Sequence, residues 1–302
     1  MQRIGFVGIG NMGSPMAANL AKKGFAVVAC DRDPGRAEQF AREHGPSCAA
    51  AARPEDLASV DALVTMLPTG ADVREALLGA SERGGIVPHL RRGTLVIDMS
   101  SADPVGTRAL GPRLAERGLL FMDAPVSGAV PRARTGTLAI MIGCEDRTAI
   151  ERARPILLAM GERLFEVGSL GTGHAMKALN NFLAGAAFAA ACEALLAGKR
   201  FGLDPTTMID VLNASTGRSW VTELVMKEQV IQARHSSGFA LGLLAKDVKI
   251  AADLATAMHL DAPVLRAVSD RWLQARDALG YSRDNTEAIL AWDADSPAPE
   301  GG

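Results

Sequence analysis

The feature that most constrains this chain is a glycine pattern close to its start. A short apolar run is followed by three glycines in the spacing G-x-G-x-x-G, at Gly8, Gly10 and Gly13. A helical pattern and a second apolar run come next, and the second run ends at Asp31, about 20 residues after the last glycine. The spacing alone is a weak signal, but this order of strand, turn, helix and strand predicts a βαβ unit that binds a dinucleotide.

Each glycine has a separate part in such a turn. Gly8 allows the tight turn itself, Gly10 lets the backbone approach a pyrophosphate, and Gly13 lets the helix pack against the sheet. The start of the helix then offers backbone N–H groups to the phosphates. A structural turn without a ligand is the alternative, and the acidic residue after the second strand argues against it.

The residue after the second strand predicts which cofactor is used. A carboxylate at Asp31 would bind the ribose hydroxyls of the adenosine half and would repel a 2′-phosphate, so NAD is predicted. NADP is not excluded, because Arg32 follows directly and could pair with that phosphate. A solvated surface charge is the other interpretation of Arg32.

Strand and helix signals alternate through the first half of the chain. Further strands are expected at residues 62–67, 94–98, 119–123, 138–143 and 163–167. Such alternation predicts an α/β fold with a Rossmann-type, mostly parallel sheet that helices cover on both faces.

After Gly171 only helical signals remain. The first of them, residues 174–201, predicts one long connecting helix whose middle is apolar on all sides, which implies burial all round. The predicted division is an NAD(P)-binding Rossmann-type domain at 1–168, an all-α domain at 169–295 and a loose, Pro- and Gly-rich tail at 296–302. Further helices are expected at residues 204–214, 221–232, 244–258, 262–279 and 286–292.

Composition narrows the classes of partner. The formal net charge is −2 and no long basic run is present, so nucleic acid has no electrostatic footprint. The longest apolar run, residues 182–192, is too short to cross a bilayer, and no signal peptide precedes the first strand. The four cysteines form no CxxC pair, so no metal site is expected. We expect a cytoplasmic protein that binds no membrane.

A second candidate site lies at the start of the long helix. Lys177 and Asn181 are four residues apart, so they share one face of that helix. A lysine at an otherwise apolar helix start is unusual, because burying an ammonium group is costly. Beside apolar surface a lysine gives up its proton more readily, which suits a general acid or base. The spacing leaves open that Lys177 only extends its charge to solvent at a domain boundary.

Several longer motifs occur through the chain. They are residues 6–20 around the glycine turn, 66–68, 98–101, 123–128, 171–181, 201–205, 212–220, Phe239 and 244–247. In these motifs the chain, from Arg3 to about Leu290, resembles the β-hydroxyacid dehydrogenase family, close to its 3-hydroxyisobutyrate dehydrogenase branch.

The resemblance implies roles for the residues near the predicted pocket. Lys177 matches the family's catalytic lysine and Asn181 its substrate-orienting asparagine, and some members rely on the position of Asn180 instead. Ser127 and the N–H of Gly128 match the pair that holds the substrate carboxylate.

The resemblance also implies which residues bind the cofactor. Lys246 matches a lysine that reaches both the cofactor and the substrate from the helical domain. The implied cofactor-binding positions are Gly8, Gly10, Asn11, Met12, Gly13, Asp31, Arg32, Leu67, Pro68, Ser101 and Lys246.

Two residues beside these motifs need separate interpretation. Ala129 stands where the family usually has glycine, so the pocket could be tighter or the loop shifted, which leaves the exact substrate open. His174, in the first turn of the long helix, is interpreted as a polar lid residue rather than a base.

The predicted function is that of a metal-independent NAD(P)-dependent oxidoreductase acting on a small β-hydroxy acid, with Lys177 as general acid and base. The first choice of reaction is 3-hydroxyisobutyrate to methylmalonate semialdehyde. Reduction of tartronate semialdehyde, glyoxylate, succinic semialdehyde or another small aldehyde acid stays open. A homodimer or homotetramer is expected, because solvent cannot cover an all-apolar helix.

Three alternative interpretations share the two-domain plan. Imine reductases and non-catalytic nucleotide-binding modules of this plan generally have another residue in place of the lysine, so Lys177 argues against both. Phosphogluconate dehydrogenases have a much larger helical domain, and no basic cluster suited to a substrate phosphate is found in this sequence.

Overall fold

The computed structural model describes residues 2–80 and 84–294, so the tail predicted at 296–302 lies outside the described residues. The chain divides into two compact units, Met1–Lys177 and Ala178–Gly302. The long helix α7 (Thr172–Phe201) begins in the first unit and continues through the second.

The first unit alternates strands and helices. Its strands are β1 (Arg3–Val7), β2 (Ala26–Cys30), β3 (Cys48–Ala50), β4 (Ala62–Thr65), β5 (Leu95–Asp98), β6 (Leu120–Asp123), β7 (Val126–Ser127), β8 (Leu138–Gly143) and β9 (Gly161–Gly168). Its helices are α1 (Gly13–Lys22), α2 (Pro34–His44), α3 (Gly70–Leu78), α4 (Pro104–Glu116), α5 (Ala129–Thr135), α6 (Arg147–Met160) and the 3-10 helices Pro54–Leu57 and Val87–His89.

The strands form one sheet in the order β3-β2-β1-β4-β5-β6-β8-β7, with β9 beside β8. Strands β1 to β6 pair in parallel, and β8 runs antiparallel to β6 and β7. The order reverses between β1 and β4, and in α/β sheets ligands bind beyond the carboxyl ends of the strands at such a reversal. The predicted mostly parallel, Rossmann-type sheet is confirmed.

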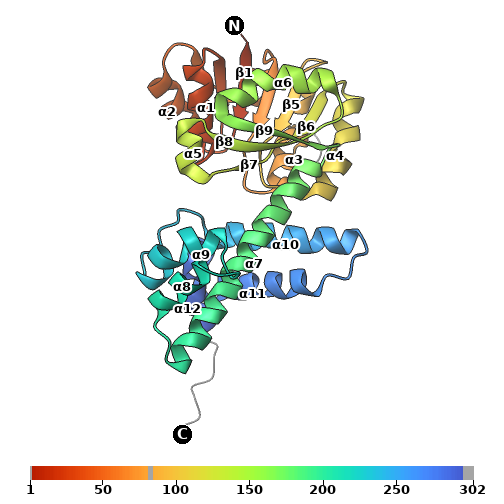
Figure 1. The fold of residues 1–302 in the computed structure, drawn as a ribbon. Helices are drawn as coiled ribbons and strands as arrows, with labels where there is room; N and C mark the ends of the chain where they lie inside the picture. Colours follow the sequence, from red (N-terminus) through yellow and green to blue (C-terminus); the bar gives the residue numbers. More distant parts are fainter. Residues whose placement is uncertain (1, 81–83, 295–302) are drawn as a thin grey trace. The chain divides into compact units, whose positions relative to one another are not determined.

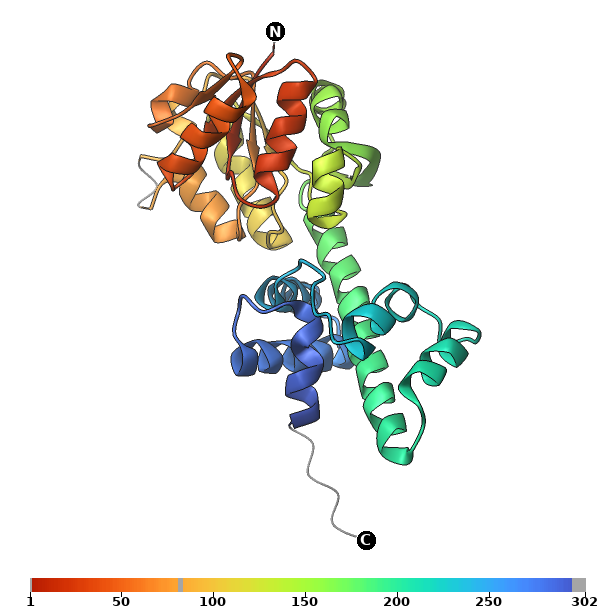
Figure 2. The same ribbon diagram turned by 90° about the vertical axis from the view of Figure 1, so that its left-hand side faces the viewer.

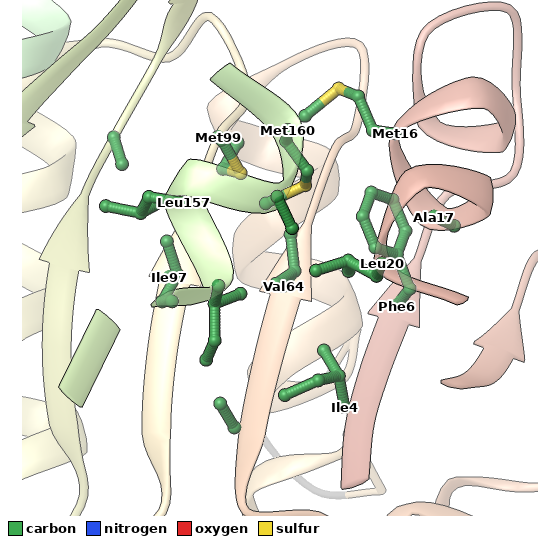
Figure 3. Packing of buried hydrophobic residues seen from close by; sticks show 14 of the residues in the cluster. Ile4, Phe6, Met16, Ala17, Leu20, Val64, Ile97, Met99, Leu157 and Met160 are labelled. Atoms are coloured by element: carbon green, nitrogen blue, oxygen red, sulfur yellow. The ribbon is translucent and has the colours of Figure 1, made fainter. Parts of the chain in front are cut away.

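Helices cover both faces of this sheet (Figure 1 and Figure 2). Side chains alternate along β1, so Phe6 packs under α1 and α6 while Val7 belongs to the layer under α3 and α4. Figure 3 shows the first layer, in which strand residues meet helix residues: Ile4, Phe6, Val64 and Ile97 with Met16, Leu20, Leu157 and Met160.

The named elements of the second unit are all helices, joined by loops and one isolated β-bridge between Ala240 and Asp284. Its aromatic core is Phe188, Trp272 and Trp292, with ring centroids 5.2 to 6.0 Å apart, and the indole N–H of Trp272 donates to the Gly185 carbonyl at 3.1 Å. Besides α7, its elements are α8 (Pro205–Asn213), α9 (Trp220–Leu224), the π-helix Met226–Ile231, α10 (Leu241–Ala257), α11 (Pro263–Leu279), the 3-10 helix Asn285–Glu287 and α12 (Ala288–Ala294).

Two helical predictions differ from the structure. The single helix expected at 221–232 is wrong, because α9 is followed by a π-helix in which Gln232 N–H donates to Lys227 C=O at 3.1 Å. Apolar periodicity over so few turns does not distinguish that bond pattern from an α-helical one. Burial of α7 on every side is also wrong for the single chain, in which Leu183 is 64% exposed.

By length and composition α7 could cross a membrane, with a mean hydropathy of 1.4 over its most apolar stretch. Within the protein 44% of that stretch is buried, and the core helix of a globular protein meets the same criterion. The absence of a membrane partner stays a prediction.

Candidate active site

Steric fit explains two of the three glycines after β1. Gly8 has φ +98°, and a Cβ at this position would overlap the carbonyl oxygen of Met66. A Cβ at Gly13 would overlap the carbonyl oxygen of Gly8. The turn itself therefore requires glycine at both positions.

Gly10 differs from its neighbours, because open space lies over it. The nearest atom that a Cβ would meet is Nη1 of Arg36, at 4.0 Å. The turn continues through exposed Asn11 and half-buried Met12, and no side chain of the described residues caps the start of α1. An open glycine beside an uncapped helix start fits the pyrophosphate of a dinucleotide.

Asp31 lies directly after β2 and holds the glycine turn in place. Its Oδ2 accepts the N–H of Ile9 at 2.7 Å, and its Oδ1 accepts the N–H of Asp33 at 2.9 Å. The half-buried carboxylate is thereby fixed beside the turn, where it suits recognition of ribose hydroxyls. Arg32 is exposed.

The loops after β4 and β5 are tied together at the same edge of the sheet. The N–H of Leu67 donates to Ser100 Oγ at 2.9 Å, and the N–H of Ser100 donates to Asp98 Oδ1 at 3.0 Å. Pro68 and Ser101 adjoin this connection. Parallel strands thus bring Leu67, Pro68 and Ser101 to the edge that carries the glycine turn.

The predicted carboxylate loop contains a strained residue. Ser127 ends β7 and is half-buried, and Gly128 follows with φ +134°. Ala129 has φ +54°, in the left-handed region that costs an L-residue about 1–2 kcal/mol. The strain lies directly beside the two residues predicted to hold the substrate.

We expect Ala129→Gly to stabilise the protein by up to about 1 kcal/mol, because glycine adopts positive φ freely but loses more chain entropy on folding. Chemical denaturation measures the change. Ala133→Gly, in the same short helix but buried, is the matched control and should destabilise. A free energy of unfolding that falls in both variants would contradict the strain at Ala129.

His174 is not a lid residue, and that interpretation is wrong. It is 1% exposed, and its ring lies between the buried carboxylates of Asp98 and Asp123. Burial raises the pKa of Asp123, an effect that the imidazole and the N–H donor of Gly171 partly offset. The available signal was that each aspartate directly ends an apolar strand.

Lys177 and Asn181 lie one turn apart on α7, as predicted from their spacing. Lys177 is half-buried, whereas Asn181 is 7% exposed. The Nδ2 of Asn181 donates to Asp247 Oδ2 at 2.6 Å, and its Oδ1 accepts from Asn180 Nδ2 at 3.2 Å. Because a carboxylate only accepts, Asp247 fixes which way the Asn181 amide points.

Asp247 also joins Asn181 to Lys246 in the second unit. The carboxylate is 2% exposed, and Lys246 Nζ lies 3.1 Å from its Oδ1. Three predicted residues, Asn180, Asn181 and Lys246, are therefore gathered around one buried acid. Sequence reasoning missed a role for Asp247, although it lies within the 244–247 motif.

The described groups suit binding of a dinucleotide and movement of a proton. The first unit presents the glycine turn, Asp31, the Ser127 loop and Lys177, and the second unit presents the cluster around Asp247. Within residues 2–80 and 84–294, no group of three or more His, Cys, Asp or Glu residues could hold a metal ion.

Two family models match successive parts of the chain. Residues 3–168 match the NAD binding domain of 6-phosphogluconate dehydrogenase, and residues 171–292 match the NAD-binding region of NADP-dependent 3-hydroxyisobutyrate dehydrogenase. Mitochondrial 3-hydroxyisobutyrate dehydrogenase of Homo sapiens is 36% identical over 296 residues, which span 95% of this chain and 85% of that protein. This chain belongs to the β-hydroxyacid dehydrogenase family.

Two further proteins are similar to this β-hydroxyacid dehydrogenase. The 2-(hydroxymethyl)glutarate dehydrogenase of Eubacterium barkeri is 33% identical, over 95% of this chain and 93% of that protein. A 3-hydroxyisobutyrate dehydrogenase structure from Mycobacterium tuberculosis, with L-serine, is 32% identical with a TM-score of 0.86, covering 97% of this chain and 99% of that one.

The comparisons confirm the predicted 3-hydroxyisobutyrate dehydrogenase-like branch and an enzyme that uses NAD(P) on small hydroxy acids. The names of the relatives differ in substrate, so the exact substrate is a matter for proposal.

Proposed function

We propose that this β-hydroxyacid dehydrogenase oxidises 3-hydroxyisobutyrate to methylmalonate semialdehyde, with NAD as its preferred cofactor. One observation supports a shared site for the carboxylate loop and the lysine, which this reaction requires. Asp123, at the end of β6, accepts the backbone N–H groups of Gly171 and His174, both at 2.7 Å. Asp123 lies four positions before Ser127 of the carboxylate loop, and its partner His174 lies three positions before Lys177. These hydrogen bonds therefore link the loop to the start of α7 within the first unit.

The side chains of the protein supply binding and proton transfer. The hydroxyl of Ser127 and the N–H of Gly128 donate to the substrate carboxylate. Neutral Lys177 accepts the substrate's hydroxyl proton at Nζ during oxidation, and its ammonium returns that proton during reduction. Asn181, one turn further along the same helix, orients the same oxygen.

Most of the predicted cofactor-binding residues lie in the first unit. Bound NAD would supply the acceptor for the hydride from the substrate carbon. The open face of Gly10 and the N–H groups at the start of α1 would hold its pyrophosphate, and Asp31 would hold its ribose. Leu67, Pro68 and Ser101, where the loops of β4 and β5 are linked, would flank the nicotinamide half.

We expect a preference for NAD over NADP of about tenfold or more in kcat/KM, because a 2′-phosphate beside the Asp31 carboxylate costs on the order of 1.4 kcal/mol or more. Asp31→Asn should narrow that preference, since Arg32 is then left to pair with the phosphate. Asp33→Asn, an exposed acid two residues on, is the control and should keep it. Rates with NAD and with NADP at one substrate concentration measure the ratio of the two kcat/KM values in each variant. An unchanged ratio in Asp31→Asn would show that this carboxylate does not select the cofactor.

The relatives support more than one small substrate. Their names include 3-hydroxyisobutyrate and 2-(hydroxymethyl)glutarate, and one similar structure holds L-serine. All three molecules share a carboxylate and a primary hydroxyl on the β-carbon, which the roles of Ser127 and Lys177 require. A methyl difference in a pocket is worth only about 1–3 kcal/mol, so a small change in the shape of the loop beside Ala129 would be enough to shift the choice.

A panel of initial rates tests the proposed function. Purified protein would be assayed with NAD and NADP against 3-hydroxyisobutyrate, L-serine and 2-(hydroxymethyl)glutarate, and with the reduced cofactors against tartronate semialdehyde, glyoxylate and succinic semialdehyde. The highest kcat/KM is expected for 3-hydroxyisobutyrate with NAD. A higher kcat/KM for another acid would support the same type of reaction but identify that acid as the substrate.

If the protein bound the cofactor but turned over no substrate of the panel, the proposed function would be wrong. A cyclic imine would then separate the imine reductase alternative from a non-catalytic nucleotide-binding module. The cytoplasmic location and the homodimer or homotetramer stay predictions.

A further inference from the structure

A buried polar cluster joins three elements of the first unit around His174. The imidazole Nδ1 lies 2.8 Å from Thr107 Oγ1 of α4 and 3.8 Å from Asp123 Oδ2 of β6. The Nε2 lies 3.8 Å from Asp98 Oδ2 of β5 and has no hydrogen-bond partner among the described residues. All four residues are 5% exposed or less, so the cluster is shielded from bulk solvent.

The hydroxyl of Thr107 determines that the Nδ1 nitrogen of the imidazole carries a proton. This hydroxyl lies 3.0 Å from the carbonyl oxygen of Asp103, which can only accept, so its single hydrogen is donated there. Its oxygen is then the acceptor for Nδ1–H of His174. The ring is therefore locked in orientation from α4, and the Asp98 carboxylate is itself held by the Thr65 hydroxyl at 2.8 Å.

Asp123 makes a second connection to the same turn of helix. Its two oxygens accept the N–H groups of Gly171 and His174, which are among the backbone donors at the start of α7. A carboxylate at this end also complements the helix dipole. The start of α7 is thus bonded to the sheet through both the backbone and the side chain of His174.

We propose that His174 is a positioning residue, which together with Asp123 fixes the first turn of α7 and so sets Lys177 relative to the Ser127 loop. The inference rests on the proposed function, in which Lys177 moves the proton. Lys177 lies three positions after His174 on the same helix, and Ser127 lies four positions after Asp123. A displacement of about 1 Å in such an arrangement can lower turnover by about 100-fold, whereas buried polar clusters add little stability over apolar packing.

The test compares variants of the full-length enzyme. His174→Phe fills the site but removes both ring nitrogens, and we expect kcat to fall by about tenfold or more with the dissociation constant of NADH and KM nearly unchanged. His174→Asn offers an amide N–H to Thr107 in place of Nδ1–H and should recover much of kcat. Thr107→Val removes the hydroxyl that accepts from His174 Nδ1–H with little change in volume, and kcat should fall by an intermediate amount. This variant keeps the proposal testable if His174→Phe does not fold.

Two further measurements separate positioning from general stability. Cys192→Ala, a fully buried change on α7 in the second unit, is the matched control and should leave kcat unchanged. Amide hydrogen exchange should accelerate in residues 171–177 of the His174 variants and not in the control.

A kcat within about twofold of wild type in both His174→Phe and Thr107→Val would overturn the proposal, as would a kcat loss matched in Cys192→Ala. A wild type without turnover on the acid panel would instead refute the proposed function. The exchange data would then decide separately whether His174 fixes the start of α7.

Discussion

Replacing Lys177 with alanine should lower kcat by about 100-fold or more while NADH still binds, because the variant loses the group that accepts and returns the substrate proton. Lys177 lies on α7 in the first unit, half-buried, three residues after the buried His174. Steady-state rates and a fluorescence titration with NADH measure the two effects separately.

Lys199→Ala is the matched control, since that lysine is exposed near the end of the same helix. It should leave both kcat and the NADH dissociation constant unchanged. If Lys177→Ala kept more than about a third of wild-type kcat, another group would have to move the proton, and the assignment would be wrong.

The second large effect is expected at the glycine turn, where two single-methyl changes should behave differently. Gly10→Ala places a methyl group in open space, so we expect normal stability but an NADH dissociation constant raised by about tenfold or more. Gly13→Ala forces a methyl group onto the Gly8 carbonyl oxygen, so it should also destabilise the protein by about 1–3 kcal/mol.

Isothermal titration with NADH and chemical denaturation, applied to both variants, measure this difference. Gly24→Ala is a control outside the turn, at a position with open space and positive φ, and it should affect stability alone. An unchanged NADH affinity in Gly10→Ala would show that the open face is not the pyrophosphate site.

The cofactor half of the site was predictable because its signal is local. Gly8 and Asp31 lie in one βαβ unit that begins with β1. The steric demand at Gly13 comes from backbone of that unit, and the demand at Gly8 comes from Met66, directly after the adjacent β4. The same holds for the strand and helix alternation, which periodicity reports directly.

The buried acids were not predictable in the same way. Asp98 and Asp123 meet His174 only because β5 and β6 end at one edge of the sheet, 76 and 51 residues away along the chain. The sequence around a histidine in a first helical turn does not show that it is buried, because the burial comes from the ends of distant strands. Asp247 meets Asn181 across 66 residues for a similar reason, so its role required the fold of the second unit.

Transfer of a labelled hydride tests the proposed reaction itself. The enzyme would be given NADH with deuterium at the transferred position of the nicotinamide, together with methylmalonate semialdehyde, and the product analysed by mass spectrometry. We expect 3-hydroxyisobutyrate that carries deuterium on the carbon bearing the hydroxyl. Unlabelled product, or no product while NADH remains bound, would contradict it.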